Sequence, residues 1–223
     1  MCFSATASFA TGAILTPLGV YTLGRSYRKD RRYLPLASFP LLFGIQQAVE
    51  GWGWLAIEGG AQSDVHAAAL GFLLFAYFLW PFLVPLAAYF VEQSRKRRAL
   101  FLALSLVGCS FGLSLYIPLL LNADWLSAEI VRGSIFYRST LIYDDFMPKT
   151  GLRLFYAAIV GLPLLFSTIA SVRVFGVIIV LSVAIGFLFF AYAFTSIWCF
   201  MAAALSIYVV EIVRRVPRNA RSI

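Results

Sequence analysis

The chain has 223 residues, of which 61% are hydrophobic and 13% charged, and its formal net charge at pH 7 is +8. Soluble globular proteins have a far larger fraction of charged residues and a smaller fraction of apolar ones, so the classes of soluble protein are excluded. The basic residues lie in short segments between apolar stretches, which is typical of contact with anionic lipid headgroups, and no nucleic-acid partner is expected.

Apolar stretches long enough to cross a bilayer, which takes about 20 helical residues, fill most of the chain. They predict an all-α fold, a polytopic membrane helix bundle in which residues 1–223 form a single domain with seven transmembrane helices. We expect one turn at Arg173 and another near Thr195 and Ser196. The expected spans are residues 6–24, 35–57, 67–91, 99–121, 153–171, 174–194 and 197–213.

The first expected span follows Ser4, whose hydroxyl is placed to cap the first helical turn. The opening residues of this span are small, which suits close contact with a neighbouring helix. These small residues are Ala5, Ala7, Ala10, Gly12 and Ala13.

The second expected span carries the most informative polar residues, because hydrocarbon penalises polar side chains. Gln46, Glu50 and Trp54 recur every four residues and share one helix face, with Gln47 beside them. An ionised carboxylate facing lipid would be costly, so this face is expected to point into the bundle. Glu50 is interpreted either as a functional carboxyl or as one that hydrogen-bonds a neighbouring helix and fixes its packing.

The third expected span begins near the only histidine, His66, on the same side of the membrane as Glu50. Further along it, Pro81 and Pro85 predict a kink, because proline lacks the N–H that continues a helix. In the fourth span, the G-x-x-x-G pattern of Gly108 and Gly112 is a weak signal for close helix packing.

The segment at about 122–152 is the one long connection, and we expect it to form an outward-facing loop or cap. The runs 134–137 and 140–143 are predicted to pair as a hairpin, and residues 127–129 to cap a short helical turn that begins near Trp125.

Charge orients the predicted bundle, because Lys and Arg stay on the cytoplasmic side during insertion. Fourteen of the eighteen basic residues fall on one side, which predicts an N-terminus outside the membrane and a cytoplasmic C-terminus. This side holds Arg25, Arg28, Lys29, Arg31, Arg32, Arg95, Lys96, Arg97, Arg98, Arg173, Arg214, Arg215, Arg218 and Arg221.

Several polar residues are expected on the outer half of the bundle, where they would line a ligand pocket. The candidate pocket residues are Gln46, Gln47, Glu50, Trp54, His66 and Tyr192. Weaker candidates for metal ligands are Cys2, Glu50, His66 and Asp144, but they converge only through long-range folding, so no metal is expected. Cys2 and Cys199 both fall on this side, where a disulfide is chemically permitted. No cofactor is identified.

The opening residues 1–9 (Met-Cys-Phe-Ser-Ala-Thr-Ala-Ser-Phe) resemble those of an uncharacterised family of bacterial multipass inner-membrane proteins. Residues 36–51 are similar to the second span of that family, and residues 75–81 to its third. The resemblance implies a bacterial inner (plasma) membrane location with a periplasmic or extracellular N-terminus, and it implies no activity.

Three classes of function remain open. The first is an accessory subunit of a membrane complex, or a binder of a small amphipathic ligand such as a lipid or quinone; a homo-oligomer is also possible. The alternative is a membrane-embedded hydrolase-like enzyme that uses Glu50 and His66 as its catalytic pair. The third is a transporter or channel, which we rank last because the chain shows no inverted repeat.

Overall fold

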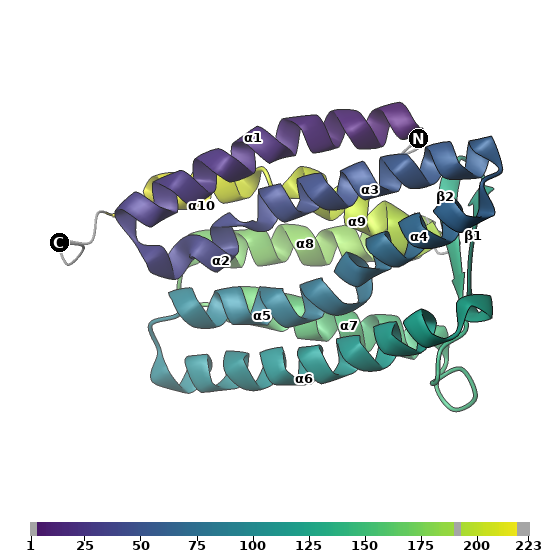
Figure 1. Ribbon diagram of the computed structural model, residues 1–223. Helices are drawn as coiled ribbons and strands as arrows, with labels where there is room; N and C mark the ends of the chain where they lie inside the picture. Colours follow the sequence, from purple (N-terminus) through teal and green to yellow (C-terminus); the bar gives the residue numbers. More distant parts are fainter. Residues whose placement is uncertain (1–3, 190–192, 218–223) are drawn as a thin grey trace.

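The computed structural model describes residues 4–189 and 193–217. Nearly all of the secondary structure in these residues is helical. In those ranges the helices form seven rods that run alternately up and down, and a two-stranded hairpin lies across one end (Figure 1). The first described residues lie at the hairpin end and the last at the opposite end. Seven helical rods are thus confirmed, whereas the all-α class needs correction for the hairpin.

Each rod consists of one to three helical segments. The first rod in the chain is α1 (Ala5–Lys29), and the second is α2 (Leu34–Ala37) with α3 (Phe39–Gly59). The third is α4 (Gln62–Leu73), a π-helical turn (Leu74–Leu79) and α5 (Trp80–Val91), and the fourth is α6 (Arg95–Leu121). After β1 (Leu126–Val131) and β2 (Ser134–Ser139) come α7 (Lys149–Leu165), α8 (Ala170–Phe189), α9 (Phe194–Leu205) and α10 (Tyr208–Arg215). Short 3₁₀ turns occupy Arg31–Tyr33 and Ala123–Trp125.

Among the described residues, four helical stretches are long and apolar enough to cross a membrane: Gln62–Val91, Arg95–Leu121, Ala170–Phe189 and Phe194–Arg215. The chain is therefore a multipass membrane protein in contact with lipid. Of the remaining rods, α7 has only 17 residues, fewer than the roughly 20 that span the hydrocarbon. Seven complete crossings stay a prediction.

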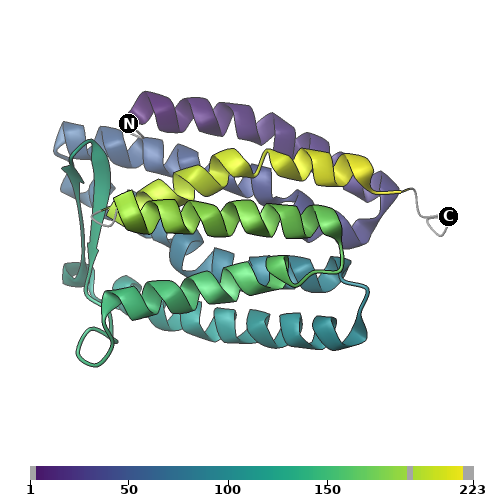
Figure 2. The same cartoon turned by 180° about the vertical axis from the view of Figure 1, so that it is seen from behind.

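Seen from behind, α8 lies between α7 and the final rod of α9 and α10 (Figure 2). The α1 helix lies along α3, and its small residues permit this contact: a Cβ at Gly12 would lie 2.9 Å from the Gly44 carbonyl oxygen. The predicted cap of α1 is confirmed, since Ser4 Oγ accepts a hydrogen bond from the Ala7 N–H at 3.2 Å.

The π-helical turn interrupts the third rod directly before the two prolines. Pro81 and Pro85 have no N–H to donate to the carbonyls of Tyr77 and Pro81, four residues earlier in each case. Those two carbonyls lie against α6 at Gly112 and Gly108, where any side chain would overlap them or press on them. The G-x-x-x-G packing predicted from the sequence is therefore confirmed, with the proline-containing rod as its partner.

The turn predicted at Arg173 is wrong. α7 ends at Leu165 and α8 begins at Ala170, so Arg173 lies inside a helix. The chain breaks earlier because Thr168 donates its backbone N–H (2.8 Å) and its hydroxyl (2.6 Å) to the Glu92 carboxylate from the α5–α6 connection. Thr195 and Ser196, near which the other turn is predicted, lie in the first turn of α9, and residues 190–192 lie outside the described residues.

The hairpin also differs from the prediction. β1 pairs antiparallel with β2, with Leu126 opposite Ser139 and Val131 opposite Ser134. The two turn residues, Arg132 and Gly133, both have positive φ (50° and 71°), which matches the twist of a two-residue hairpin. A short helical turn does occur at Ala123–Trp125, but residues 127–129 after it are strand, and 140–143 follow the hairpin instead of forming its second strand.

Candidate functional site

Polar side chains of α3 form hydrogen bonds in the bundle interior. Glu50 is only 2% exposed, and its carboxylate accepts hydrogen bonds from Ser196 Oγ of α9 (2.5 Å) and Gln47 Nε2 (3.1 Å). One turn earlier, Gln46 Oε1 accepts a hydrogen bond from the Trp80 indole N–H at 2.8 Å. The inward orientation predicted for this face is confirmed, and its hydrogen bonds join α3 to α5 and α9.

Several buried polar atoms of this face have no hydrogen-bond partner among the described residues, including Gln47 Oε1 and Trp54 Nε1. A buried polar atom without a partner costs roughly 1–3 kcal/mol. This face therefore retains hydrogen-bonding capacity for a water molecule or another polar group.

The other predicted site residues have separate environments. His66 is half-buried in α4, and within the described ranges it forms no hydrogen bond or ion pair with Glu50. Asp144 lies between β2 and α7, where it accepts the Leu141 N–H. Cys2 and Tyr192 lie outside the described residues. Cys199 is buried and free, and no cluster of three metal-binding side chains occurs in the described part of the chain.

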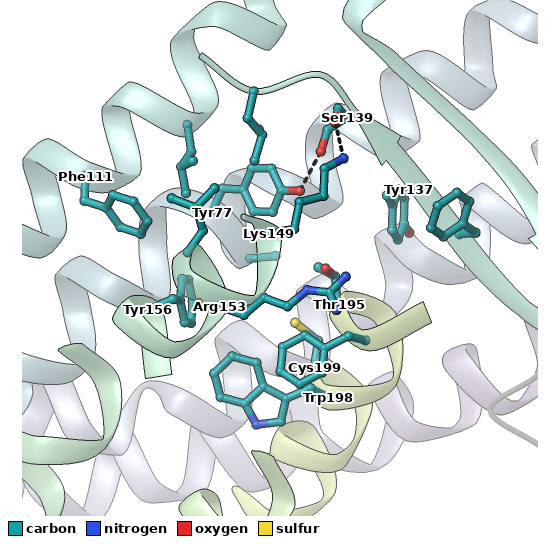
Figure 3. A pocket seen from close by; sticks show the side chains of 16 residues that line it. Tyr77, Phe111, Tyr137, Ser139, Lys149, Arg153, Tyr156, Thr195, Trp198 and Cys199 are labelled. Carbon is teal, nitrogen blue, oxygen red and sulfur yellow. Dashed lines mark hydrogen bonds between the residues drawn. The ribbon is translucent and has the colours of Figure 1, made fainter. Parts of the chain in front are cut away.

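A cavity of about 250 Å³ lies beneath the hairpin, enclosed by β2, α6, α7, α9 and the π-helical turn (Figure 3). This volume is just below the roughly 300–1,000 Å³ of typical small-molecule sites. Its described lining residues are Ala76, Tyr77, Phe111, Leu115, Phe136, Tyr137, Ser139, Leu141, Lys149, Leu152, Arg153, Tyr156, Phe194, Thr195, Trp198 and Cys199.

Polar groups lie at the hairpin side of this cavity. The Tyr77 hydroxyl is 2.9 Å from Ser139 Oγ, and Lys149 Nζ donates to the Ser139 carbonyl oxygen at 3.3 Å. The Arg153 guanidinium lies 5.1 Å from the centroid of the Phe194 ring, within the range of a cation–π contact. Figure 3 shows both basic side chains directed into the space among these groups.

A second cavity, of about 30 Å³, adjoins the first and is lined almost wholly by apolar side chains. Both cavities share Tyr156, Trp198 and Cys199. The remaining lining residues of the second cavity lie in α3, α5, α7, α8 and α9, so the internal space becomes more apolar away from the hairpin.

Sequence reasoning found the Glu50 face but missed the cavity. Lys149 and Arg153 count among the few basic residues on the outer side, and their spacing of four places them on one helix face. That spacing is the signal that could have pointed to the cavity. Tyr77 and Thr195 carried no comparable signal, because long-range packing brings them to the cavity.

These helical rods, with a polar cluster in the core and a cavity at one end, define a multipass helical membrane protein. Over residues 1–222 the chain matches the family described as "Family of unknown function (DUF6629)", and it belongs to that family. This match includes residues 1–9, 36–51 and 75–81, which carry the resemblance noted from the sequence. No curated protein and no solved structure matches the chain.

Proposed function

We propose that this protein holds a small amphipathic ligand, such as a lipid or quinone, in the cavity beneath the hairpin. The observation that carries the proposal is the cavity of about 250 Å³, with aromatic and aliphatic walls and polar groups at one side. A mostly apolar pocket with a few convergent polar groups is the usual form of a small-molecule site.

We place the hairpin end at the periplasmic or outer surface of a bacterial inner membrane. The opposite end carries most of the basic residues, including the run Arg95–Arg98 and Arg214 and Arg215. Such a charge bias sets the orientation of membrane proteins and supports a cytoplasmic location for that end. The ligand would then enter from the outer leaflet.

In this proposal the Glu50 face supports the site instead of lining it. Glu50 fixes α9 through Ser196, and the adjacent Thr195 lines the cavity. No hydrogen bond between described residues joins Glu50 to His66, so no specific observation favours the catalytic pair of the enzyme alternative.

The test is native mass spectrometry of protein extracted gently from its own membrane, with a cavity-filling variant beside the natural protein. Ala76→Phe puts a ring into the cavity wall, and Ala103→Phe puts the same ring on an exposed face of α6 as the control. We expect an added ligand mass on the natural protein and on Ala103→Phe, and its loss from Ala76→Phe.

Other outcomes separate the alternatives. An added mass that matches polypeptides would instead support an accessory subunit, and a multiple of the chain mass would indicate a homo-oligomer. A ligand retained equally by folded Ala76→Phe would contradict the cavity as its site.

A further inference from the structure

We infer that the ligand of this cavity carries an anionic headgroup, a carboxylate or a phosphate, which Lys149 and Arg153 bind. This inference rests on the proposed function, because it specifies the ligand of the same site. It is carried by the position of the two basic side chains and by the charge of the lining.

Lys149 and Arg153 lie one turn apart at the beginning of α7, so their side chains leave the helix on the same face. Both line the cavity, and Figure 3 shows them entering it beside Tyr77 and Thr195. Two basic groups with adjacent hydroxyls can donate several hydrogen bonds to the oxygens of one carboxylate or phosphate. Such charge-assisted bonds are about twice as strong as neutral ones.

The described lining of the cavity contains no acidic side chain. Lys149 forms an ion pair with Asp144 at 3.8 Å, and Asp144 does not line the cavity. Two positive charges and no negative charge are thus found on the described lining, and opposite charges on a site and its ligand favour binding. The cavity therefore favours an anionic ligand over a neutral one.

The position of Lys149 adds a second argument. It is the first residue of α7, where the helix macrodipole presents positive partial charge. The charge of Lys149 and the positive end of the helix therefore add up at this point. An anion at this point would be stabilised by the helix end as well as by both side chains.

The lining shared with the neighbouring apolar cavity of about 30 Å³ would contact the apolar part of the ligand. With a headgroup beside Lys149 and Arg153, an aliphatic tail would pass Tyr156 and Trp198, which the two cavities share. The small volumes suit a single chain, so single-chain amphiphiles are the appropriate probes.

The experiment measures equilibrium binding to the purified full-length protein in a neutral detergent. The probes are palmitate, 1-palmitoyl-lysophosphatidate and the uncharged hexadecanol. We expect the natural protein to bind at least one of the two anions about tenfold or more tightly than hexadecanol. Lys149→Gln and Arg153→Gln should each weaken anion binding by about tenfold and leave hexadecanol binding within about twofold.

Arg138→Gln is the matched control, because this arginine is exposed on β2 and pairs with Glu129 instead of lining the cavity. It should leave all three affinities unchanged. The charge-preserving Arg153→Lys should retain a preference for the anions, and Lys149, being largely exposed, can be replaced with little effect on folding.

Equal affinity of the natural protein for hexadecanol and both anions would overturn the inference while leaving an amphipathic ligand in place. Anion binding that is as tight in Lys149→Gln and Arg153→Gln as in the natural protein would also overturn the inference. Failure of all three probes, together with no added ligand mass from the native membrane, would instead overturn the proposed function itself.

Discussion

Glu50 shows how a carboxyl in the core of a membrane bundle can serve packing. Its two oxygens accept hydrogen bonds from Ser196 and Gln47, and the first of these joins α3 to α9. Removing one member of a buried hydrogen-bonded group leaves its partners unsatisfied, which costs more than the bond itself. Glu50 is therefore expected to contribute to stability whatever ligand the protein binds.

Glu50→Ala should lower the free energy of unfolding by about 1–3 kcal/mol, because Ser196 and Gln47 both lose their acceptor. Glu50→Gln should lower the free energy of unfolding by less, since its amide oxygen can still accept the hydrogen bond from Ser196. Thermal unfolding in detergent measures both. The control is Glu58→Ala on the exposed surface of α3, expected to change stability by less than about 0.5 kcal/mol. Equal effects of Glu50→Ala and Glu58→Ala would rule out this role.

Glu92 has a comparable structural role at the opposite end of the bundle. Its carboxylate accepts the backbone N–H groups of Gln93, Ser94 and Thr168 and the Thr168 hydroxyl. Burial alone would raise the pKa of Glu92, but these hydrogen bonds outweigh it and hold the pKa below its ordinary value of 4.5. The folded protein thus binds this proton less tightly than the unfolded chain does.

It follows that Glu92 contributes stability above about pH 4.5, and that this is lost as the pH falls through its lower folded-state pKa. Glu92→Gln should lower the free energy of unfolding by about 1–3 kcal/mol at pH 7. The difference from the natural protein should shrink as the pH falls below about 4.5. Unfolding measured from pH 7 downward tests this, with exposed Glu129→Gln as the control. A difference that stays constant with pH would contradict the prediction.

Among the helices, the contact between α6 and the proline-containing rod sets the tightest requirement on side-chain size. Gly108 and Gly112 bring α6 against the carbonyls of Pro81 and Tyr77, which the prolines leave without their usual helical donors. Close backbone approach through small residues is a main source of helix association in lipid.

Gly108→Ala should therefore be strongly destabilising, because its Cβ would overlap the Pro81 carbonyl oxygen and α6 would have to move. We expect a loss of about 1–3 kcal/mol or more. Gly24→Ala is the matched control: it is also inside a helix, but no atom lies within 4 Å of its added Cβ. It should be neutral or slightly stabilising, because alanine favours helix more than glycine does. Thermal unfolding of the two variants gives the comparison, and similar losses in both would refute the packing argument.

Hydropathy located all seven helical rods, because the apolar length needed to cross a bilayer leaves a strong signal. It misplaced the turn before α8, because that turn depends on Glu92, whose carboxylate meets Thr168 from a distant loop. It also misplaced the hairpin, since the turn at Gly133 is a local backbone feature with little hydropathy contrast. Of the site, the Glu50 face was predictable from helical periodicity, whereas the cavity was not, because it forms only where five elements meet.

On the scale of the whole molecule, charge differs between the two ends of the bundle. Arg132, Arg138, Lys149 and Arg153 lie near the hairpin, and the remaining described basic residues lie toward the opposite end. If the opposite end is cytoplasmic, the cavity lies at the outer side of the membrane. The connection between α5 and α6 then lies at the inner surface.

Cysteine labelling in intact cells tests this orientation, in a Cys2→Ser background. If the hairpin end faces outward, Glu129→Cys should react with a membrane-impermeant maleimide, because its position is exposed on the hairpin. Gln93→Cys, exposed in the α5–α6 connection, should react only after the membrane is permeabilised. The opposite pattern would mean that the protein is inserted the other way round.

The π-helical turn makes the third rod sensitive to the number of residues between α4 and α5. A turn with i→i+5 hydrogen bonds accommodates one residue more than an α-helical turn. Ala76 and Tyr77 lie on this turn and line the cavity, so the additional residue helps to set the shape of the binding space. Deleting one residue between Leu74 and Leu79 would let α4 and α5 join as a continuous helix that still crosses the membrane. A one-residue gap at this point in a related sequence would therefore indicate a protein that has kept the bundle but has a cavity of different shape.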